Sequence, residues 1–358
     1  MFEIGMTCAR ALLVAVTITV SGAAASASTA DVTAQKRAIA ISRLPRFQPP
    51  TGWTWGTMTN ADGAHLRYGW VNSASPLRGV IVLAPSFQAP AEEYFETAGD
   101  FSRNGFAVWI LDRRGQGGSD RWPGAERSAY NEGAQRESRD LRQFALKAEA
   151  HYPHIPAYLV GESFGGLIGL QVLHDNPGLF AAGVFSSPGI DFHTNGVPRA
   201  LLWTLTMSAC GLGFSKYYAP TQHDWAFDAD PGGASDPVRN DAQRALAEEG
   251  WQLTEPKLRE GGATYGWVKM LFEEAAVEEG AGWPESIRTP VLFGYTPMDR
   301  IARADVIQSV CGRMPRCTLA KFAVSGHALF TDADSTRSPW MRRIESFLDQ
   351  TSKARSAQ

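Results

Sequence analysis

The sequence predicts an α/β fold, with a mostly parallel central sheet, helices on both faces and a mainly helical insertion. Three continuous apolar runs of strand length, at 79–85, 106–112 and 157–163, are typical of strands buried on both faces. Segments with helical spacing alternate with these runs, as expected for a parallel sheet. The stretch 191–288 has no clear strand and several helical segments, so we interpret it as an insertion into the sheet-forming part.

The remaining elements follow in order along the chain. A first strand is expected at 64–71, and three more follow the apolar runs, at 181–189, 289–295 and 317–324. Helices are expected at 92–104, 136–151, directly after residue 163, and 338–348. The chain therefore divides into a signal peptide (1–30), an arm (31–56), a first core part (57–190), the insertion (191–288) and a second core part (289–350).

Composition excludes several classes of function. The chain has 358 residues, 44% of them hydrophobic, and a formal net charge of -3. No basic or acidic block stands out, so we expect no nucleic-acid partner. The seven histidines are scattered and no paired metal-ligand motif occurs, so we expect no metal site.

The N-terminus has the pattern of a secretory signal. Arg10 supplies a positive charge, 11–20 is a short apolar run, and small residues follow it. Cleavage is expected after Ala27 or after Ala30; the alternative is an uncut membrane anchor. The signal predicts a periplasmic or secreted protein and an oxidising compartment. Cys311 and Cys317 flank a short loop and are a candidate disulfide, which leaves Cys210 as an odd thiol.

The strongest motif is G-E-S-F-G at 161–165, which fits the pattern G-x-S-x-G. It lies between a buried strand and a helix, and this is the context in which the pattern forms a nucleophile elbow. The turn holds Ser163 in a strained backbone conformation above the sheet, and the helix after it directs its positive dipole end at the same place. Ser163 is therefore the predicted nucleophile.

A serine hydroxyl needs a base, and the base needs an orienting carboxylate. In this arrangement the chain order is Ser, then Asp or Glu, then His. His327 follows the last predicted strand and is the expected base. Asp299 follows the strand before it and is the expected acid, with Asp305 as the second candidate. The structural alternative for Asp299 is the N-cap of a helix.

An oxyanion hole of this type uses two backbone N–H groups. One belongs to the residue after the nucleophile, Phe164. The other is expected from the loop after the strand at 79–85, where Phe87 is the predicted donor. Ser86 or Gln88 takes this role if the loop is shifted.

Together these residues resemble the α/β-hydrolase superfamily, specifically its lysophospholipase and monoacylglycerol lipase group. The resemblance covers about 67–348 and is carried by D-R-R-G-Q-G-G-S, G-E-S-F-G-G, P-M-D-R and G-H-A-L-F. It implies the α/β-hydrolase fold, a helical lid formed by the insertion, and hydrolysis of esters that carry one fatty acyl chain. The sequence departs from the group at Pro85 and Ser86, where relatives usually carry His-Gly.

The predicted activity is hydrolysis of a small-molecule or lipid ester, a lysophospholipid or monoacylglycerol, through a Ser-His-Asp triad. No cofactor is expected, because the triad supplies the proton transfer. The apolar insertion is a candidate for transient contact with a membrane surface, and the oligomeric state is left open. General carboxylesterase activity is one alternative. An exopeptidase is another, with Glu273 and Glu274 or Glu278 and Glu279 holding an amine. A non-catalytic binding module is disfavoured by the complete triad.

Overall fold

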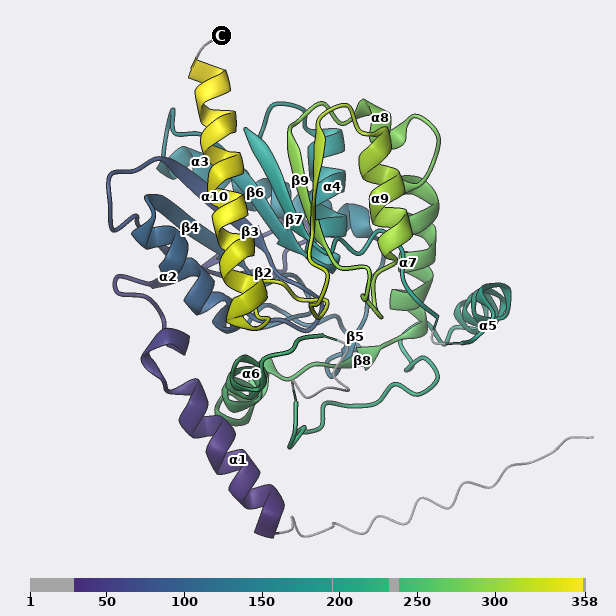
Figure 1. Cartoon of the computed structure of the whole chain (residues 1–358). Helices are drawn as coiled ribbons and strands as arrows, with labels where there is room; N and C mark the ends of the chain where they lie inside the picture. Colours follow the sequence, from purple (N-terminus) through teal and green to yellow (C-terminus); the bar gives the residue numbers. More distant parts are fainter. Residues whose placement is uncertain (1–28, 195, 232–237, 357–358) are drawn as a thin grey trace, which may run out of the picture.

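The structure, a computed structural model, describes residues 29–194, 196–231 and 238–356, and its centre is an eight-stranded sheet (Figure 1). The strands run in the order β1-β2-β4-β3-β6-β7-β9-β10. β1 and β2 are antiparallel to their neighbours, and the other strands are parallel. The predicted mostly parallel sheet is confirmed. Its strands are β1 (Thr54–Thr59), β2 (His65–Val71), β3 (Gly79–Ala84), β4 (Phe106–Leu111), β6 (Ala157–Glu162), β7 (Ala182–Ser186), β9 (Val291–Tyr295) and β10 (Cys317–Lys321).

Helices cover both faces of this sheet because its central strands are apolar on both sides. In β3, Val80 and Val82 pack into one hydrophobic cluster, and Ile81 and Leu83 pack into another. The first cluster also contains side chains of α3 (Ala134–His151), α4 (Phe164–Asp175) and α9 (Ala304–Arg313). The second contains side chains of α2 (Phe95–Arg103) and α10 (Asp334–Ser356), with Trp340 fully buried.

The insertion is mostly helical. Its helices are α5 (Arg199–Gly211), α6 (Ala242–Thr254), α7 (Tyr265–Glu278) and α8 (Trp283–Ser286). It also contains a strand that the sequence pattern did not indicate, β8 (Gly261–Ala263), which pairs in parallel with β5 (Ser128–Ala129) of the core part. This small second sheet fastens the insertion to the loop that follows β4.

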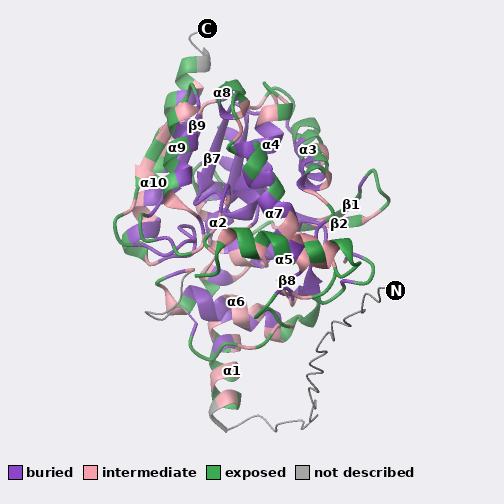
Figure 2. Ribbon diagram, turned by 90° about the vertical axis from the view of Figure 1, so that its right-hand side faces the viewer, coloured by how far each residue is buried: buried purple, intermediate pink, exposed green. Residues whose placement is uncertain are grey.

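Helix α5 lies at the edge of the molecule (Figure 1), where it packs against α7 on one side, and much of its remaining surface is exposed (Figure 2). The exposed side chains are unusually apolar: Leu201 is 51% exposed and Leu205 46%, and Leu212 just beyond the helix is 74% exposed. A hydrophobic surface of this kind is typical of a contact site.

Several elements lie outside the sequence-based expectations. Helix α1 (Thr29–Ser42) occupies the predicted arm and packs against α6, and α9 follows β9. Strand β1 crosses the expected boundary between arm and core. Short 3-10 turns occur at Pro45–Phe47, Ala91–Tyr94 and Pro256–Leu258, and the second of these forms the start of the helix expected at 92–104.

The predicted signal peptide lies outside the described residues except for its last positions, which belong to α1. Within the described chain, no helix combines the length and the apolar character that a bilayer crossing requires. Cys311 and Cys317 are joined by a disulfide, and Cys210 is a half-buried free thiol.

Candidate active site

Ser163 occupies the sharp turn between β6 and α4. Its backbone has φ 50° and ψ -116°, a left-handed conformation that is unusual for a residue with a side chain. The turn is held because the Ser163 N–H donates to the Ser186 carbonyl at 2.8 Å, and the Ser163 carbonyl accepts from Gly189 N–H at 2.8 Å. The strained elbow that the motif predicts is therefore present.

The glycines of the motif allow backbone segments to pass close to this turn. A Cβ atom on Gly165 would lie 2.0 Å from the Ala84 carbonyl oxygen and 2.5 Å from that of Pro85. A Cβ atom on Gly161 would lie 2.7 Å from the Gly165 carbonyl oxygen. Glycine at 165 is therefore what lets the end of β3 approach the start of α4.

Asp299 and His327 lie side by side. The Nδ1 atom of His327 is 2.8 Å from Oδ2 of Asp299, and both residues are buried. The other carboxylate oxygen of Asp299 accepts from the backbone N–H groups of Ile301 and Ala302, at 2.8 and 2.9 Å. One oxygen thus fixes the turn before α9, and the other orients the imidazole. Asp305, the second candidate acid, instead forms an ion pair with Arg303 at the surface.

The pair shifts the pKa values of both groups. Burial by itself lowers the pKa of His327, but the charge of Asp299 and the hydrogen bond to it outweigh burial, so the pKa is raised. Burial raises the pKa of Asp299, yet the same interaction with His327 leaves it below its usual range. The Asp299 carboxylate therefore stabilises a proton on His327.

The second ring nitrogen of His327 is free to act. Within the described part of the chain, Nε2 of His327 is buried and has no hydrogen-bond partner, Ser163 Oγ included. The structure thus joins Asp299 to His327 by a hydrogen bond but does not join His327 to Ser163. Catalytic hydrogen bonds of this kind are often formed only once substrate is bound.

The loop after β3 is ordered by hydrogen bonds to its neighbours. Ser86 N–H donates to the Tyr94 hydroxyl at 3.0 Å, so it is already occupied. This leaves Phe87 and Gln88 as donors for an oxyanion. Arg113, from the D-R-R-G motif, donates to the Ser86 carbonyl at 3.0 Å, and its guanidinium lies 4.3 Å from the ring centroid of Phe164.

Trp267 of α7 packs against both predicted oxyanion residues. Its ring centroid is 4.3 Å from that of Phe87 and 5.3 Å from that of Phe164. Aromatic pairs at such distances contribute attraction beyond simple burial. The insertion therefore contacts the site directly through Trp267.

Glu162, the residue before Ser163, has a role that the sequence analysis missed. It is fully buried, and its carboxylate accepts hydrogen bonds from the Tyr94 hydroxyl (2.9 Å), the Ser186 hydroxyl (3.0 Å) and the Phe330 N–H (3.3 Å). Burial raises the pKa of Glu162. The signal was present in the sequence, because this is a charged residue at the end of an otherwise apolar buried strand.

Through these bonds Glu162 connects the parts of the site. Tyr94 reaches the loop after β3 by its bond from Ser86, and Phe330 lies three residues after His327. Leu329 N–H also donates to the Ser186 hydroxyl, at 3.3 Å. The elbow, the predicted oxyanion loop and the histidine loop are thus held by one buried carboxylate.

The glutamates considered for an exopeptidase lie on or just after α7 and are not grouped into one site. Glu278 is fully buried, Glu274 hydrogen-bonds to Gln171, and Glu273 pairs with Lys269 on the helix surface. The described residues contain no group of three or more His, Cys, Asp or Glu side chains arranged to hold a metal ion.

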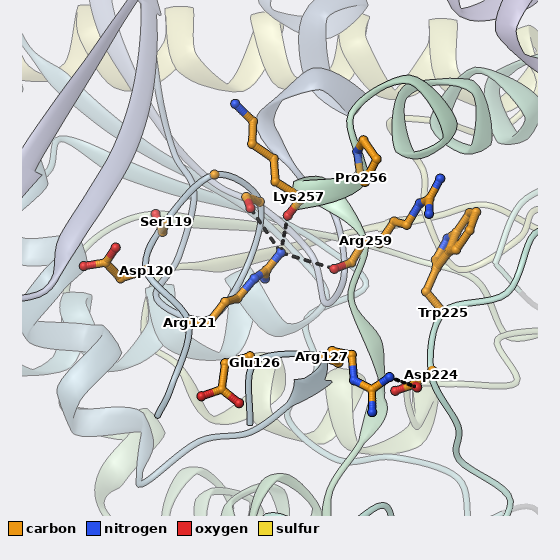
Figure 3. A pocket seen from close by; sticks show the side chains of 12 residues that line it. Ser119, Asp120, Arg121, Glu126, Arg127, Asp224, Trp225, Pro256, Lys257 and Arg259 are labelled. Carbon is orange, nitrogen blue, oxygen red and sulfur yellow. Dashed lines mark hydrogen bonds and ion pairs between the residues drawn. The ribbon is translucent and has the colours of Figure 1, made fainter. Parts of the chain in front are cut away.

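A cavity of about 570 Å³ lies beside the small β5–β8 sheet (Figure 3). None of the predicted catalytic residues lines it. In Figure 3 the Arg121 guanidinium points at the backbone carbonyls of Lys257 and Arg259, and Arg127 is paired with Asp224. These cations are therefore engaged by the protein itself.

The fold and the Ser163 elbow agree with the family to which the sequence is matched. Residues 75–334 match the family described as "Serine aminopeptidase, S33" (Hydrolase_4). The chain belongs to this family. Since the match covers most of the chain and the sheet is mostly parallel with helices on both faces, the predicted α/β-hydrolase identity is confirmed.

Among curated proteins, this α/β-hydrolase is similar to monoacylglycerol lipases. It is 32% identical over 135 residues to monoacylglycerol lipase of Mycolicibacterium smegmatis, which is 37% of this chain and 45% of that protein. It is 30% identical over 133 residues to monoglyceride lipase of Rattus norvegicus, 37% of this chain and 42% of the relative. The chain thus matches less than half the length of these relatives.

Solved structures share the fold over a greater length. A monoglyceride lipase from Saccharomyces cerevisiae, solved with a substrate analogue, aligns with a TM-score of 0.67 at 16% identity, over 85% of this chain and 96% of that one. A carboxyl esterase from Bacillus coagulans aligns with a TM-score of 0.68 at 11% identity, over 84% and 99%. At such identities the likeness establishes the fold alone.

Proposed function

We propose that the protein is a carboxylic ester hydrolase that works through Ser163, His327 and Asp299. The observation that carries the proposal is the buried Asp299–His327 hydrogen bond in a chain whose elbow holds Ser163 at φ 50°. Family membership and the similarity to monoacylglycerol lipases support the same chemistry.

In the proposed mechanism His327 Nε2 accepts the Ser163 hydroxyl proton as the serine oxygen attacks the ester carbonyl. Asp299 keeps the proton of the neutral ring on Nδ1 and stabilises the imidazolium that forms. The same proton then passes to the leaving alcohol, and an acyl-enzyme remains. His327 then takes a proton from water as the water oxygen attacks the acyl-enzyme, and it returns that proton to the Ser163 oxygen as the carboxylic acid product leaves.

The backbone N–H groups of Phe87 and Phe164 are the proposed oxyanion donors. Phe164 begins α4, so its N–H lies at the positive end of the helix dipole. Ser86 is unsuited because its N–H already donates to Tyr94. Developing negative charge at this place would be stabilised without any reorganisation of the loop.

The proposed substrates are monoacyl lipids, lysophospholipids or monoacylglycerols. Helix α5 supports this choice, because Leu201, Leu205 and Trp203 lie at its surface, where they can meet an acyl chain or a membrane surface. We further propose export to the periplasm or the exterior, on the strength of the N-terminal signal pattern and the disulfide between Cys311 and Cys317.

The test compares wild type with Ser163→Ala on monooleoylglycerol, lysophosphatidylcholine and a short-chain p-nitrophenyl ester. Wild type should hydrolyse the lipids, and Ser163→Ala should show no activity above background. Labelling by a fluorophosphonate probe should likewise require Ser163. Equal hydrolysis by the two proteins would remove Ser163 from the mechanism, and activity on the short ester alone would replace the lipid assignment by a general carboxylesterase.

Exopeptidase activity is the second candidate, favoured by the description of the matched family. Release of an aminoacyl dye by wild type, with no ester hydrolysis, would support it instead.

A further inference from the structure

A second cavity, of about 270 Å³, lies beside the cavity of Figure 3 and shares Asp224 and Trp225 with it. Its charge is one-sided. Four of the described side chains that line it are carboxylic acids, and none of the described lining residues is a lysine or arginine; the acids are Asp224, Glu248, Glu249 and Glu260. A cavity of this size is slightly smaller than one for a whole drug-sized ligand, so it suits a single polar group of a larger molecule.

Two of these acids each have one buried carboxyl oxygen without a hydrogen-bond partner among the described residues. Glu260 is only 4% exposed, and its Oε2 atom has no hydrogen-bond partner among the described residues. Oε2 of Glu249 is likewise buried and has no hydrogen-bond partner among the described residues. Glu248, by contrast, pairs with Arg239 at 2.7 Å, and Asp224 pairs with Arg127 at 2.9 Å. Buried carboxyl oxygens without a donor are uncommon in folded proteins, and both residues that carry them line this cavity.

Burial has the expected electrostatic effect on both groups. It raises the pKa of Glu260 to about 8, against the opposing influence of Arg121 and Arg113. It also raises the pKa of Glu249 to about 8, with a further contribution from the charge of Glu248. A cation placed in the cavity would favour the ionised form of each carboxyl.

The cavity is built from fixed elements and adjoins the proposed oxyanion loop. Glu260 immediately precedes β8, whose pairing with β5 holds it in place. Gln88 lines the cavity, follows Phe87 directly, and donates from Nε2 to the carbonyls of Glu260 and Gly261, each at 2.9 Å. The Cα atoms of consecutive residues are only about 3.8 Å apart, so the wall of the cavity continues into the loop that carries Phe87.

We infer that this cavity binds an organic ammonium group of the substrate while the ester lies at Ser163. The inference deepens the proposed function and rests on it: it selects, among esters, those that carry a positive charge. A headgroup amine and an amine on the acyl part share this chemistry.

The test uses two matched substrate pairs. The first pair is the choline ester and the neutral, isosteric 3,3-dimethylbutyl ester of one fatty acid. The second pair is the p-nitrophenyl esters of 6-aminohexanoic and heptanoic acids. Wild type should favour the cationic member of one pair in kcat/KM by about tenfold or more, because opposite charges roughly 4 Å apart attract by more than that factor in a protein-like dielectric. The pair that responds identifies which part of the substrate carries the charge.

The preference should depend on Glu260 and Glu249. In Glu260→Gln the ratio between cationic and neutral ester should fall toward one, and Glu249→Gln should lower it as well. Glu255→Gln is the matched control, because Glu255 lies in the same segment but does not line the cavity; it should keep the wild-type ratio. Cooperative thermal unfolding of each variant shows that it is folded.

Binding without turnover separates this inference from the proposed function. Choline chloride, titrated calorimetrically into Ser163→Ala, should bind, and binding should be lost in Ser163→Ala/Glu260→Gln. Selectivity that survives in Glu260→Gln/Glu249→Gln, or the absence of any preference in wild type, overturns the inference even if the esters are hydrolysed. If neither ester is hydrolysed, the proposed function fails, and the choline titration still decides whether the cavity binds an ammonium group.

Discussion

Replacing Glu162 by alanine should damage both the stability and the activity of the protein. Three donors lose their acceptor: the Tyr94 hydroxyl, the Ser186 hydroxyl and the Phe330 N–H. All three bonds are buried, so water cannot replace the carboxylate without entering the core.

The size of the effect follows from these three bonds. Leaving a buried donor unsatisfied costs about 1–3 kcal/mol. Because the three donors belong to one network, their costs are not additive, and we expect a loss near the lower limit of the sum, about 3 kcal/mol in the free energy of unfolding. A domain is stable by only about 5–15 kcal/mol, so the variant should fold but unfold at clearly lower urea concentration.

Glu162→Gln separates geometry from charge. The glutamine oxygen can still accept from Ser186 and Phe330, so the free energy of unfolding should fall by less than in Glu162→Ala. The charge is lost, however, and the negative charge of Glu162 helps to raise the pKa of His327. The acid limb of kcat/KM should therefore move to lower pH in Glu162→Gln.

Urea unfolding and pH profiles with a p-nitrophenyl ester measure both effects. Glu149→Ala, on the exposed side of α3, is the matched control and should change neither property by a measurable amount. The reasoning is refuted if Glu162→Ala matches wild type within about 1 kcal/mol and keeps its kcat/KM, because a structural role then does not exist.

Since the pKa of His327 is raised, kcat/KM should increase with pH through a midpoint above about 6.5. Asp299→Asn removes the main interactions that oppose burial, so the midpoint should fall and kcat should drop roughly 10⁴-fold; an unchanged profile would contradict the pairing. Gly165→Ala should reduce kcat/KM strongly by pushing the Ala84–Pro85 backbone away, while Gly211→Ala, where a Cβ meets nothing within 4 Å, should leave it unchanged. The pKa of Glu260 is about 8 in the folded protein and about 4.3 in the unfolded chain, so the free energy of unfolding of the wild type should fall as pH rises between these values. The free energy of unfolding of Glu260→Gln should exceed that of the wild type by up to about 5 kcal/mol at the upper end of this range. The difference in melting temperature should widen with pH and be absent at pH 4. Thiol titration of the oxidised, denatured full chain should detect Cys8 and Cys210 only, and four reactive thiols would argue against the disulfide. The double variant Cys311→Ser/Cys317→Ser should have a free energy of unfolding lower by about 2 kcal/mol.

The central sheet could be predicted because its signal is local. Strands β3, β4 and β6 are each buried along their whole length, and each is a continuous apolar run in the sequence. The positions of Ser163, Asp299 and His327 followed from where such strands end. The structural alternative for Asp299 was the N-cap of a helix, but the N-cap of α9 is Arg303. The Asp299 carboxylate instead accepts from Ile301 and Ala302 N–H in the turn before α9 while it bonds to His327.

Other elements depend on contacts between distant parts of the chain. β5 has two residues and β8 three, so neither is long enough to show a strand pattern, and each exists because it pairs with the other. Helix α1 has no marked apolar face in its sequence and is covered by α6. The partners of Glu162 come from three separate segments, which no pattern around residue 162 reveals. The acids of the second cavity likewise meet only through folding.

The contact between α1 and α6 also limits the order in which parts of the chain can fold. The helices approach so closely that a Cβ on Gly250 would lie 2.3 Å from the Ala38 carbonyl oxygen. Yet Ala242, the first residue of α6, is 200 residues beyond Ser42, the last of α1. At a synthesis rate of about 5–20 residues per second, α1 leaves the ribosome roughly 10–40 s before its partner exists. Until then the side of α1 that α6 covers has no partner, so the first described helix of the chain cannot dock before residues 242–254 have been made.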